Sequence, residues 1–250
     1  MPQLPSPLAR RLLDGPVRRV VADALHSTRR LVEWYGAIAP GTRAAARFGA
    51  FGPGSCIAFP VATLFGAAAI HLGRDTLVGR SCTLTVGYGI GSPLPERGLV
   101  IGDRCVIGAR STITAHDSVT LGDDVWFGQG VFVSDASHGY QDPDVPVGLQ
   151  VGTHQPVVVG DGSWVGHHAI LLPGTRLGRN VVVAAGAVVR GEVPDHSVVA
   201  GVPARVVRRL EPRVGWVGRE PDDVREVRRH ADVVAYLTTG HGADGASSTG

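Results

Sequence analysis

A period of six residues governs the central part of this chain and restricts what it can fold into. Aliphatic residues recur at every sixth position without a slip at Val159, Val165, Leu171, Leu177, Val183 and Val189. The same spacing runs through three earlier stretches, at Leu72, Val78 and Leu84, at Ile101, Ile107 and Ile113, and at Leu121, Phe127 and Val133. A coiled coil would show a period of about 3.5 and a sandwich a period of about 2, so the pattern indicates a repeat architecture.

Two further regularities accompany the aliphatic positions. Glycine directly follows most of them, as in Val159-Gly160 and Ile101-Gly102. The fourth residue after the aliphatic is usually small, as at Cys82, Cys105, Ser111, Val125, Ser163, Ala169, Thr175, Val181 and Ala187. A short strand and a tight turn would place one aliphatic and one small side chain inward per flat side, with glycine at corners that need unusual backbone conformations. Three such sides make one turn of a triangular prism, which buries its core only when turns stack.

Composition excludes several classes of protein. All 24 basic residues are Arg, which excludes Schiff-base chemistry on a lysine and a Walker-type phosphate loop. The net charge of +2, without a basic patch interleaved with aromatics, argues against a nucleic-acid partner. The three cysteines, Cys56, Cys82 and Cys105, lack metal-ligand spacing and are expected to be small buried side chains. No secretory signal is recognisable, so we expect a cytoplasmic, reducing location.

The repeat and its interruptions divide the chain. We expect an N-terminal helical segment over residues 1–47, a β-helix domain over 48–204 with a loop at 135–158, a helical extension over 205–239 and a disordered tail over 240–250. The period also breaks at residues 91–99. Long excursions from a rigid scaffold are where function tends to lie, so the two interruptions are the first places to look for a site.

Helical spacing of apolar residues predicts the first helix. Pro16 stands near its start, and Val20, Val21 and Ala24 begin an apolar stripe. Arginines lie off that stripe, which favours a solvated face, with peripheral contact to an anionic membrane surface as the alternative. Pro221, followed by aspartates and spaced valines, predicts the second helix near the C-terminus.

The repeats resemble a known family. The run VVVGDGSWVGHHAILLPGTRLGRNVVVAAGAVVRGEVPDHSVVAGVPARVVRRL (157–210) looks like the C-terminal half of the hexapeptide-repeat O-acetyltransferases, typified by galactoside and maltose acetyltransferases. The stretch DASHGYQDPDVPVGLQ (135–150) is similar to the active-site loop of polysaccharide-biosynthesis members. The resemblance implies a left-handed parallel β-helix, contrary to the usual right-handed crossover. The predicted fold class is therefore all-β, a left-handed parallel β-helix with flanking N- and C-terminal helices.

The resemblance also implies an activity and its residues. It implies transfer of an acetyl or other short acyl group from acetyl-CoA, or a related acyl-CoA, to a hydroxyl of a small sugar or glycoconjugate, by a homotrimer without a metal. The family's catalytic histidine falls on His138. Its coenzyme A contacts fall on His167, Ala185, Arg190, Gly191, Arg205 and Arg208. The family often has a small residue in place of His167 and Thr-Lys or Thr-Arg in place of Arg190-Gly191. The acceptor-side Asn and Asp of galactoside acetyltransferases find no match near Gly108 and His116.

Histidine suits the implied reaction on chemical grounds. Attack of a hydroxyl on a thioester needs a base near neutral pH, and the imidazole of His138 is such a group. Asp135, three residues earlier, either orients that imidazole or is a turn residue that caps its own loop.

Two other classes of protein remain as alternatives. A metal enzyme resembling the γ-class carbonic anhydrases would need imidazoles such as His138, His167 and His168 to converge, but adjacent residues of a strand point to opposite faces. A non-catalytic β-helix scaffold is the second. A sugar nucleotidyltransferase is disfavoured because no Gly-rich nucleotide domain precedes the repeats.

Overall fold

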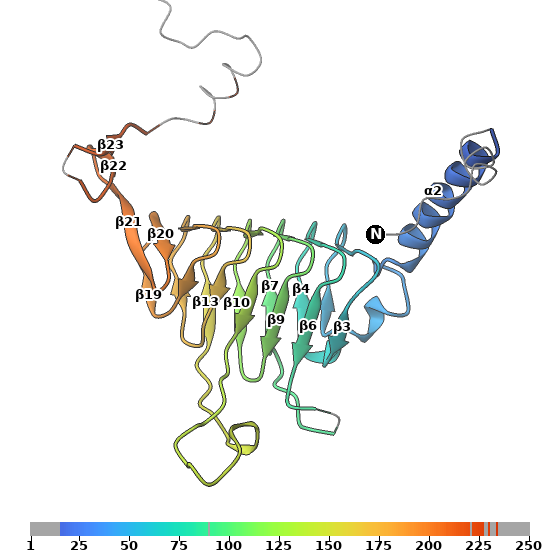
Figure 1. Ribbon diagram of the computed structural model, residues 1–250, viewed down its shortest axis with the longest axis horizontal. Helices are drawn as coiled ribbons and strands as arrows, with labels where there is room; N and C mark the ends of the chain where they lie inside the picture. The colour runs from blue at the N-terminus through green and yellow to red at the C-terminus, as the bar shows by residue number, and fades with distance from the viewer. Residues whose placement is uncertain (1–15, 90, 221, 228–229, 231–233, 235–250) are drawn as a thin grey trace, which may run out of the picture.

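Three parallel sheets make up the body of the computed structural model, which describes residues 16–89, 91–220, 222–227, 230 and 234 (Figure 1). The first sheet contains β1 (Ala50–Phe51), β4 (Ile70–Leu72), β7 (Leu99–Ile101), β10 (Val119–Leu121), β13 (Val157–Val159), β16 (Arg176–Leu177) and β19 (Glu192–Val193). The second begins with β2 (Cys56–Ile57), β5 (Leu77–Val78), β8 (Val106–Ile107), β11 (Trp126–Phe127), β14 (Trp164–Val165), β17 (Val182–Val183) and β20 (Ser197–Gly201). The third contains β3 (Thr63–Phe65), β6 (Thr83–Val86), β9 (Thr112–Ala115), β12 (Phe132–Ser134), β15 (Ile170–Leu171) and β18 (Val188–Val189).

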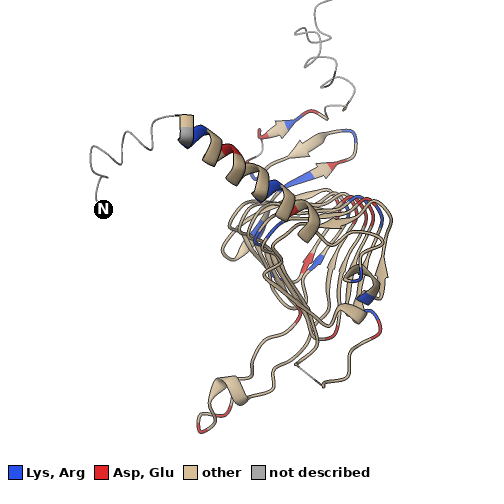
Figure 2. Cartoon of the chain, turned by 90° about the vertical axis from the view of Figure 1, so that its right-hand side faces the viewer, with Lys and Arg blue, Asp and Glu red and all other residues tan. Residues whose placement is uncertain are grey.

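The chain visits the three sheets in rotation and therefore forms a coil. Every third strand returns to the same sheet and pairs in parallel with the strand one turn earlier, as β10 pairs with β7 and β13. The view along the coil shows its three-sided outline (Figure 2). The stacked, three-sided coil predicted from the period of six is thus confirmed.

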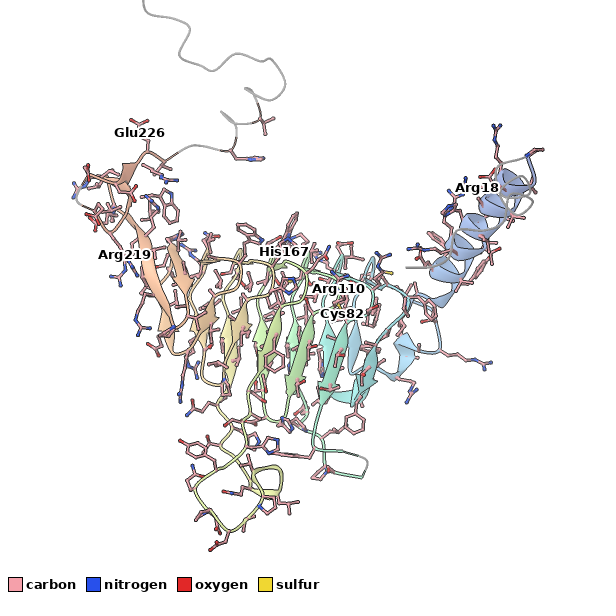
Figure 3. All side chains as sticks on the ribbon, viewed as in Figure 1. Arg18, Cys82, Arg110, His167, Arg219 and Glu226 are labelled. Carbon is pink, nitrogen blue, oxygen red and sulfur yellow. The ribbon has the colours of Figure 1, made fainter. Side chains whose placement is uncertain are left out.

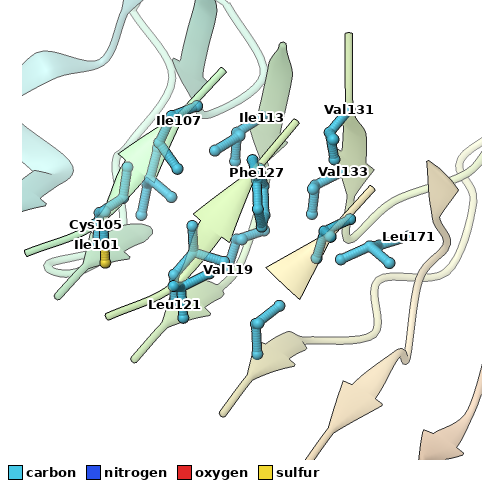
Figure 4. Close-up of a cluster of buried hydrophobic side chains, with 14 of the residues drawn as sticks. Ile101, Cys105, Ile107, Ile113, Val119, Leu121, Phe127, Val131, Val133 and Leu171 are labelled. Carbon is cyan, nitrogen blue, oxygen red and sulfur yellow. The ribbon is translucent and has the colours of Figure 1, made fainter. Parts of the chain in front are cut away.

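The core of the coil is built from the aliphatic positions. Leu84, Ile107, Ile113 and Leu171 are at most 1% exposed. Figure 4 shows the last three among their buried neighbours. Alternation along each strand places one neighbour inward and the next outward. All the small residues four positions later are buried as well, from Cys82 to Ala187. The inward set predicted from the sequence is therefore confirmed.

Buried hydroxyls tie successive turns of the coil together. The Ser55 hydroxyl donates to the Gly73 carbonyl at 2.6 Å and accepts the Thr76 N–H at 2.9 Å. The Thr76 hydroxyl repeats the pattern, donating to Gly102 at 2.8 Å and accepting from Cys105 at 3.0 Å. Each hydroxyl thus satisfies backbone groups that the corner leaves outside the sheet ladder, which otherwise would be costly to bury.

The glycines that follow the aliphatic residues have a different role from the one predicted. Their φ values are not positive; instead, a Cβ on Gly166 would lie 2.6 Å from the backbone nitrogen of Ala185 in the next turn. A Cβ on Gly160 would lie 2.5 Å from Gly178 in the same way. Positive φ occurs elsewhere at the corners, often in other residues, such as Asp124 at 56° and His168 at 57°. These glycines therefore permit close stacking of turns.

Helix α2 (Pro16–Gly36) extends away from the first turn of the coil (Figure 1). It confirms the helix predicted after Pro16, and its apolar stripe is exposed at Val20, Val21, Leu25, Leu31 and Val32. Its C-terminal end and the coil frame an apolar groove of about 1120 Å³. Among the described residues, no helix has the length and hydropathy needed to cross a bilayer. The remaining short helices are η1 (Ala45–Arg47), η2 (Ala67–Ala69) and η3 (Val147–Leu149).

The C-terminal region corrects the first part of the helical extension predicted over 205–239, whereas His230 and Val234, described residues in its later part, are helical. Residues in this range form β21 (Ala204–Glu211), β22 (Gly215–Val217) and β23 (Val224–Arg225), paired antiparallel beyond β20. The edge of the second sheet offers unpaired backbone groups to the chain that follows, and this pairing outweighs the local helical pattern. The tail over 240–250 and most of residues 228–239 lie outside the described residues.

Replacing Leu84 with Ala should lower the free energy of unfolding by about 2–5 kcal/mol, because the fully buried side chain leaves a cavity between turns. The matched control Leu25→Ala, at a leucine 66% exposed on α2, should change it by less than about 0.5 kcal/mol. Urea unfolding monitored by circular dichroism measures both. Equal losses in the two variants would contradict the assignment of the core.

Candidate active site

Two loops leave the coil at the same corner, where the chain passes from the third sheet to the first (Figure 1). One joins β6 to β7 and the other joins β12 to β13. They correspond to the two breaks in the period, at 91–99 and 135–158. The short turn between β9 and β10, residues 116–118, lies one coil turn from each loop. Both excursions and this turn therefore meet at one place.

A pocket of about 350 Å³ lies between the loops and this turn. Its lining includes Tyr88, His116, His138 and His154, together with residues 148–152. Three imidazoles and a phenol thus face one small space. Of the described residues, none that lines it is acidic or carries a guanidinium. Among these lining side chains, the three imidazoles and the Tyr88 phenol can exchange protons with a ligand.

The loop that carries His138 is braced internally. The Gln150 amide donates to the carbonyls of Asp142 and Val145 at 2.7 and 2.8 Å. Its side-chain oxygen accepts the Asp142 N–H at 3.1 Å, and the Gly139 N–H donates to the Gln150 carbonyl at 3.3 Å. These bonds fold the loop back on itself. His138 itself is exposed at the pocket wall.

Asp135 is fully buried, and its carboxylate is occupied by backbone donors. It accepts the N–H groups of His116, Asp117 and Ser118, each at a shortest distance of 2.8 Å. Among the described residues it makes no hydrogen bond with His138. No contact therefore supports the alternative, raised from the sequence, that Asp135 orients His138. The Asp135 side chain instead fixes the turn at residues 116–118 through these hydrogen bonds.

Sequence reasoning missed Tyr88 and His154, and it named His116 only as a position near which the family's acceptor-side residues find no match. The Tyr88 hydroxyl lies 2.9 Å from Nε2 of His154, which joins the two loops. The rings of Tyr88 and His116 are 4.7 Å apart, and those of His116 and His154 are 5.5 Å apart. His154 lies inside the predicted loop, but nothing in the sequence distinguishes it there. The only available signal was that both breaks in the period fall at the same corner of the prism.

The predicted coenzyme A contacts lie elsewhere on the coil. His167 lies along the edge opposite the loop that carries His138 (Figure 3). Its Nδ1 accepts the Gln129 N–H at 2.9 Å, and its carbonyl accepts the Gly186 N–H beside exposed Ala185. The predicted residues at 167 and 185 are therefore brought together on adjacent turns. In a single chain they are not brought to His138.

The three predicted arginines differ in their surroundings. Arg190 is exposed and precedes Gly191, whose φ is +80°. Arg205 is also exposed. Arg208 is less available to bind a phosphate than Arg190 and Arg205, because its guanidinium forms an ion pair with Asp223 and its side chain is only 16% exposed. That hydrogen-bonded guanidinium holds the pKa of the Asp223 carboxyl below its usual range. Arg208 therefore anchors the C-terminal strands.

The described residues do not form a metal site of the kind that the carbonic-anhydrase alternative requires. No group of three or more His, Cys, Asp or Glu side chains in that part of the chain is placed to hold a metal ion. Within one chain, His167 lies along the edge of the coil opposite the loop that carries His138 (Figure 3). The three imidazoles named in that alternative therefore do not converge in a single chain.

Two family models match the repeats. "Bacterial transferase hexapeptide (six repeats)" matches residues 156–191, and "Hexapeptide repeat of succinyl-transferase" matches residues 98–135. Between the two matches lies most of the loop that carries His138. The hexapeptide repeat is thus found independently on both sides of the candidate site.

Curated relatives share part of the chain. It is 37% identical over 86 residues to the putative lipopolysaccharide biosynthesis O-acetyl transferase WbbJ of Escherichia coli, covering 32% of this chain and 44% of the relative. It is 40% identical over 58 residues to the galactoside O-acetyltransferase of the same organism, covering 23% and 29%. The matched segments therefore span less than half of the length of either relative.

A solved structure shares the fold. AntD, an N-acyltransferase from Bacillus cereus in complex with dTDP and 3-hydroxybutyryl-CoA, superposes with a TM-score of 0.55. The match covers 66% of this chain and 84% of that chain at 18% identity. At this identity the likeness concerns the fold alone.

Replacing Asp223 with Asn should remove a pH-dependent part of the stability. Because the folded-state pKa of Asp223 is lowered, its ion pair with Arg208 stabilises the fold fully above the unfolded-state value of about 4 and ceases to do so as pH falls through the folded-state value. The Tm difference between wild type and variant should be largest near neutral pH and shrink in acid. A difference that is independent of pH would contradict this role.

Proposed function

We propose that this chain is a member of the hexapeptide-repeat acetyltransferase family and transfers an acetyl group from acetyl-CoA to a hydroxyl of a sugar or glycoconjugate, a proposal supported by the two family matches and the similar relatives. The observation that carries the proposal is the pocket at the loop corner, with His138 on its wall between two matched sets of repeats. Two of the similar relatives are named as O-acetyltransferases, which supports this class of reaction.

His138 acts as the general base in this proposal. Its imidazole takes the proton of the acceptor hydroxyl as the oxygen attacks the thioester carbonyl. A backbone N–H stabilises the tetrahedral oxyanion, which collapses with loss of the coenzyme A thiolate. The imidazolium returns its proton to that thiolate, so no acyl-enzyme is needed.

The composition of the pocket favours a hydroxyl acceptor over an amine. A sugar amine is largely an ammonium ion near neutral pH, and a site for it gains from an acidic side chain that faces it. Among the described residues that line the pocket there is no such side chain, and Asp135 lies behind it with its oxygens bonded to backbone. Imidazoles can accept a proton from a neutral hydroxyl.

Coenzyme A would bind along the opposite edge of a neighbouring chain. His167, Ala185, the Arg190–Gly191 pair and Arg205 are all at least partly exposed on the later turns of the coil. Guanidiniums match phosphate by geometry, and exposed Arg205 is better placed for one than ion-paired Arg208. Acetyl-CoA is the proposed donor, and the same chemistry accommodates other short acyl groups.

A homotrimer would bring the two parts of the site together. The loop that carries His138 and the edge that carries His167 lie on opposite sides of one chain, so in this proposal a second chain supplies the complementary part (Figure 3). The outer face of the second sheet supports packing, because Leu77, Trp126 and Trp164 lie in one register row and are 48%, 56% and 51% exposed. Head-to-tail contacts of this kind close at three copies in a cyclic trimer.

The hand of the coil and the use of α2 are two further parts of the proposal. We propose a left-handed coil, supported by the two hexapeptide matches. Helix α2 presents an exposed apolar stripe beside arginines, a composition suited to peripheral contact with an anionic membrane surface.

Replacing His138 with Ala should lower kcat by roughly 10²–10⁴ while KM for acetyl-CoA stays nearly unchanged, since only the base is removed. Release of free coenzyme A thiol, measured with a chromogenic disulfide, follows the reaction. Tyr140→Ala, an exposed position in the same loop, is the control and should retain activity. Activity of His138→Ala within a few-fold of wild type would remove His138 from this role.

Mixing two impaired variants tests the trimer. Light scattering should give three chains per particle for the wild type. His138→Ala and Arg205→Ala, each impaired alone, should recover part of the activity after subunit exchange, because some interfaces then carry both intact partners. A monomer, or no recovery after confirmed exchange, would defeat the shared site.

A further inference from the structure

The ring of His116 separates a buried carboxylate from the pocket. It follows the end of β9, and a quarter of its side chain, 24%, is exposed toward the pocket that it lines. Its Nδ1 is sealed from solvent and, among the described residues, has no hydrogen-bond partner. Oδ1 of Asp135 lies 3.7 Å from this nitrogen.

The surroundings of His116 determine which nitrogen carries the proton. The Asp135 side chain is fully buried, and its oxygens accept three backbone N–H groups, so they are acceptors toward the ring. A lone pair on Nδ1 would face these acceptor oxygens without a donor between them, which is unfavourable in a low-dielectric setting. A proton on Nδ1 turns the same approach into an attraction. The other groups that face the ring are Tyr88 and His154, with Asp117 next in the chain.

We propose that Asp135 holds the proton of neutral His116 on Nδ1, so that the Nε2 lone pair accepts a hydrogen bond from the acceptor molecule. His116 is then a specificity-determining residue that contacts the acceptor, and Asp135 is the positioning residue behind it. The inference rests on the proposed function, since it assigns the group that recognises the hydroxyl-bearing substrate. The inference also accounts for the buried Nδ1 of His116, which has no hydrogen-bond partner among the described residues.

The neighbouring rings indicate the kind of acceptor. Tyr88 is 62% exposed, and its hydroxyl is fixed by His154, so its ring forms a stable flat wall beside His116. A sugar ring can lay its apolar face on such an aromatic surface while its hydroxyls bond outward. The ligand is therefore a hydroxylated ring. One of its hydroxyls donates a hydrogen bond to Nε2 of His116, and another hydroxyl faces His138.

Nitrogen NMR of the full-length protein tests the tautomer directly. In protein labelled with ¹⁵N-histidine at a pH where the ring is neutral, the His116 signals are identified by their loss in His116→Gln. We expect a protonated Nδ1 and an unprotonated Nε2 for His116, and a shift toward the Nε2–H form in Asp135→Asn. An Nε2–H tautomer in the wild type would overturn the inference, whether or not the Asp135 variant folds.

Acceptor kinetics test the role in recognition. His116→Gln should lower kcat/KM for the acceptor by about 10- to 100-fold, as expected when a buried hydrogen bond is lost, while KM for acetyl-CoA changes less than about twofold. His26→Gln, on α2, is the matched control and should match the wild type.

The two proposals fail in distinguishable ways. If the wild type acetylates a hydroxyl but His116→Gln leaves acceptor kcat/KM within about twofold, the role of His116 is wrong and the proposed function stands. If the wild type acetylates no acceptor, both the proposed function and the contact with the acceptor are wrong. In that case the NMR result still decides whether Asp135 sets the tautomer of His116.

Discussion

Close stacking of successive turns is the constraint on which the rest of this structure depends. Glycines such as Gly166 bring the backbones of adjacent turns so near that any Cβ would collide with the next turn. Aliphatic side chains fill the interior, and buried hydroxyls such as that of Thr76 bridge the corners. Because each turn depends on its neighbours, the corners are rigid and repeat at a fixed spacing. Loops inserted at one corner therefore emerge side by side.

The candidate site follows from this geometry. Two loops and one tight turn leave the coil at the same corner, and the fully buried Asp135 joins the loop of His138 to the turn of His116 through backbone hydrogen bonds. Tyr88 and His154 connect the two loops above it. The pocket thus rests on rigid elements although its walls are loops, which is the arrangement that holds reacting groups in place.

Much of the fold could be predicted, because period six is a direct consequence of inward-facing positions on a three-sided coil. The buried residues and the two excursions follow from it, and the first helix follows from the helical spacing of its apolar residues. The strands after β20 could not be predicted, since their pairing depends on an open sheet edge far from the local pattern. The same holds for the site: His138 was found by resemblance, but the neighbours of Asp135 and the ion pair of Arg208 are tertiary contacts that no spacing encodes.

The central claim is acyl transfer to a hydroxyl at the loop corner, and product analysis tests it most directly. The wild-type protein is incubated with acetyl-CoA and a panel of sugars, amino sugars and glycolipids, and the products are analysed by mass spectrometry before and after mild alkali. The account predicts an acceptor that gains one acetyl group and loses it in alkali, as an ester does. An alkali-stable product on an amino sugar, which is an amide, or no acetylated product at all, would contradict it.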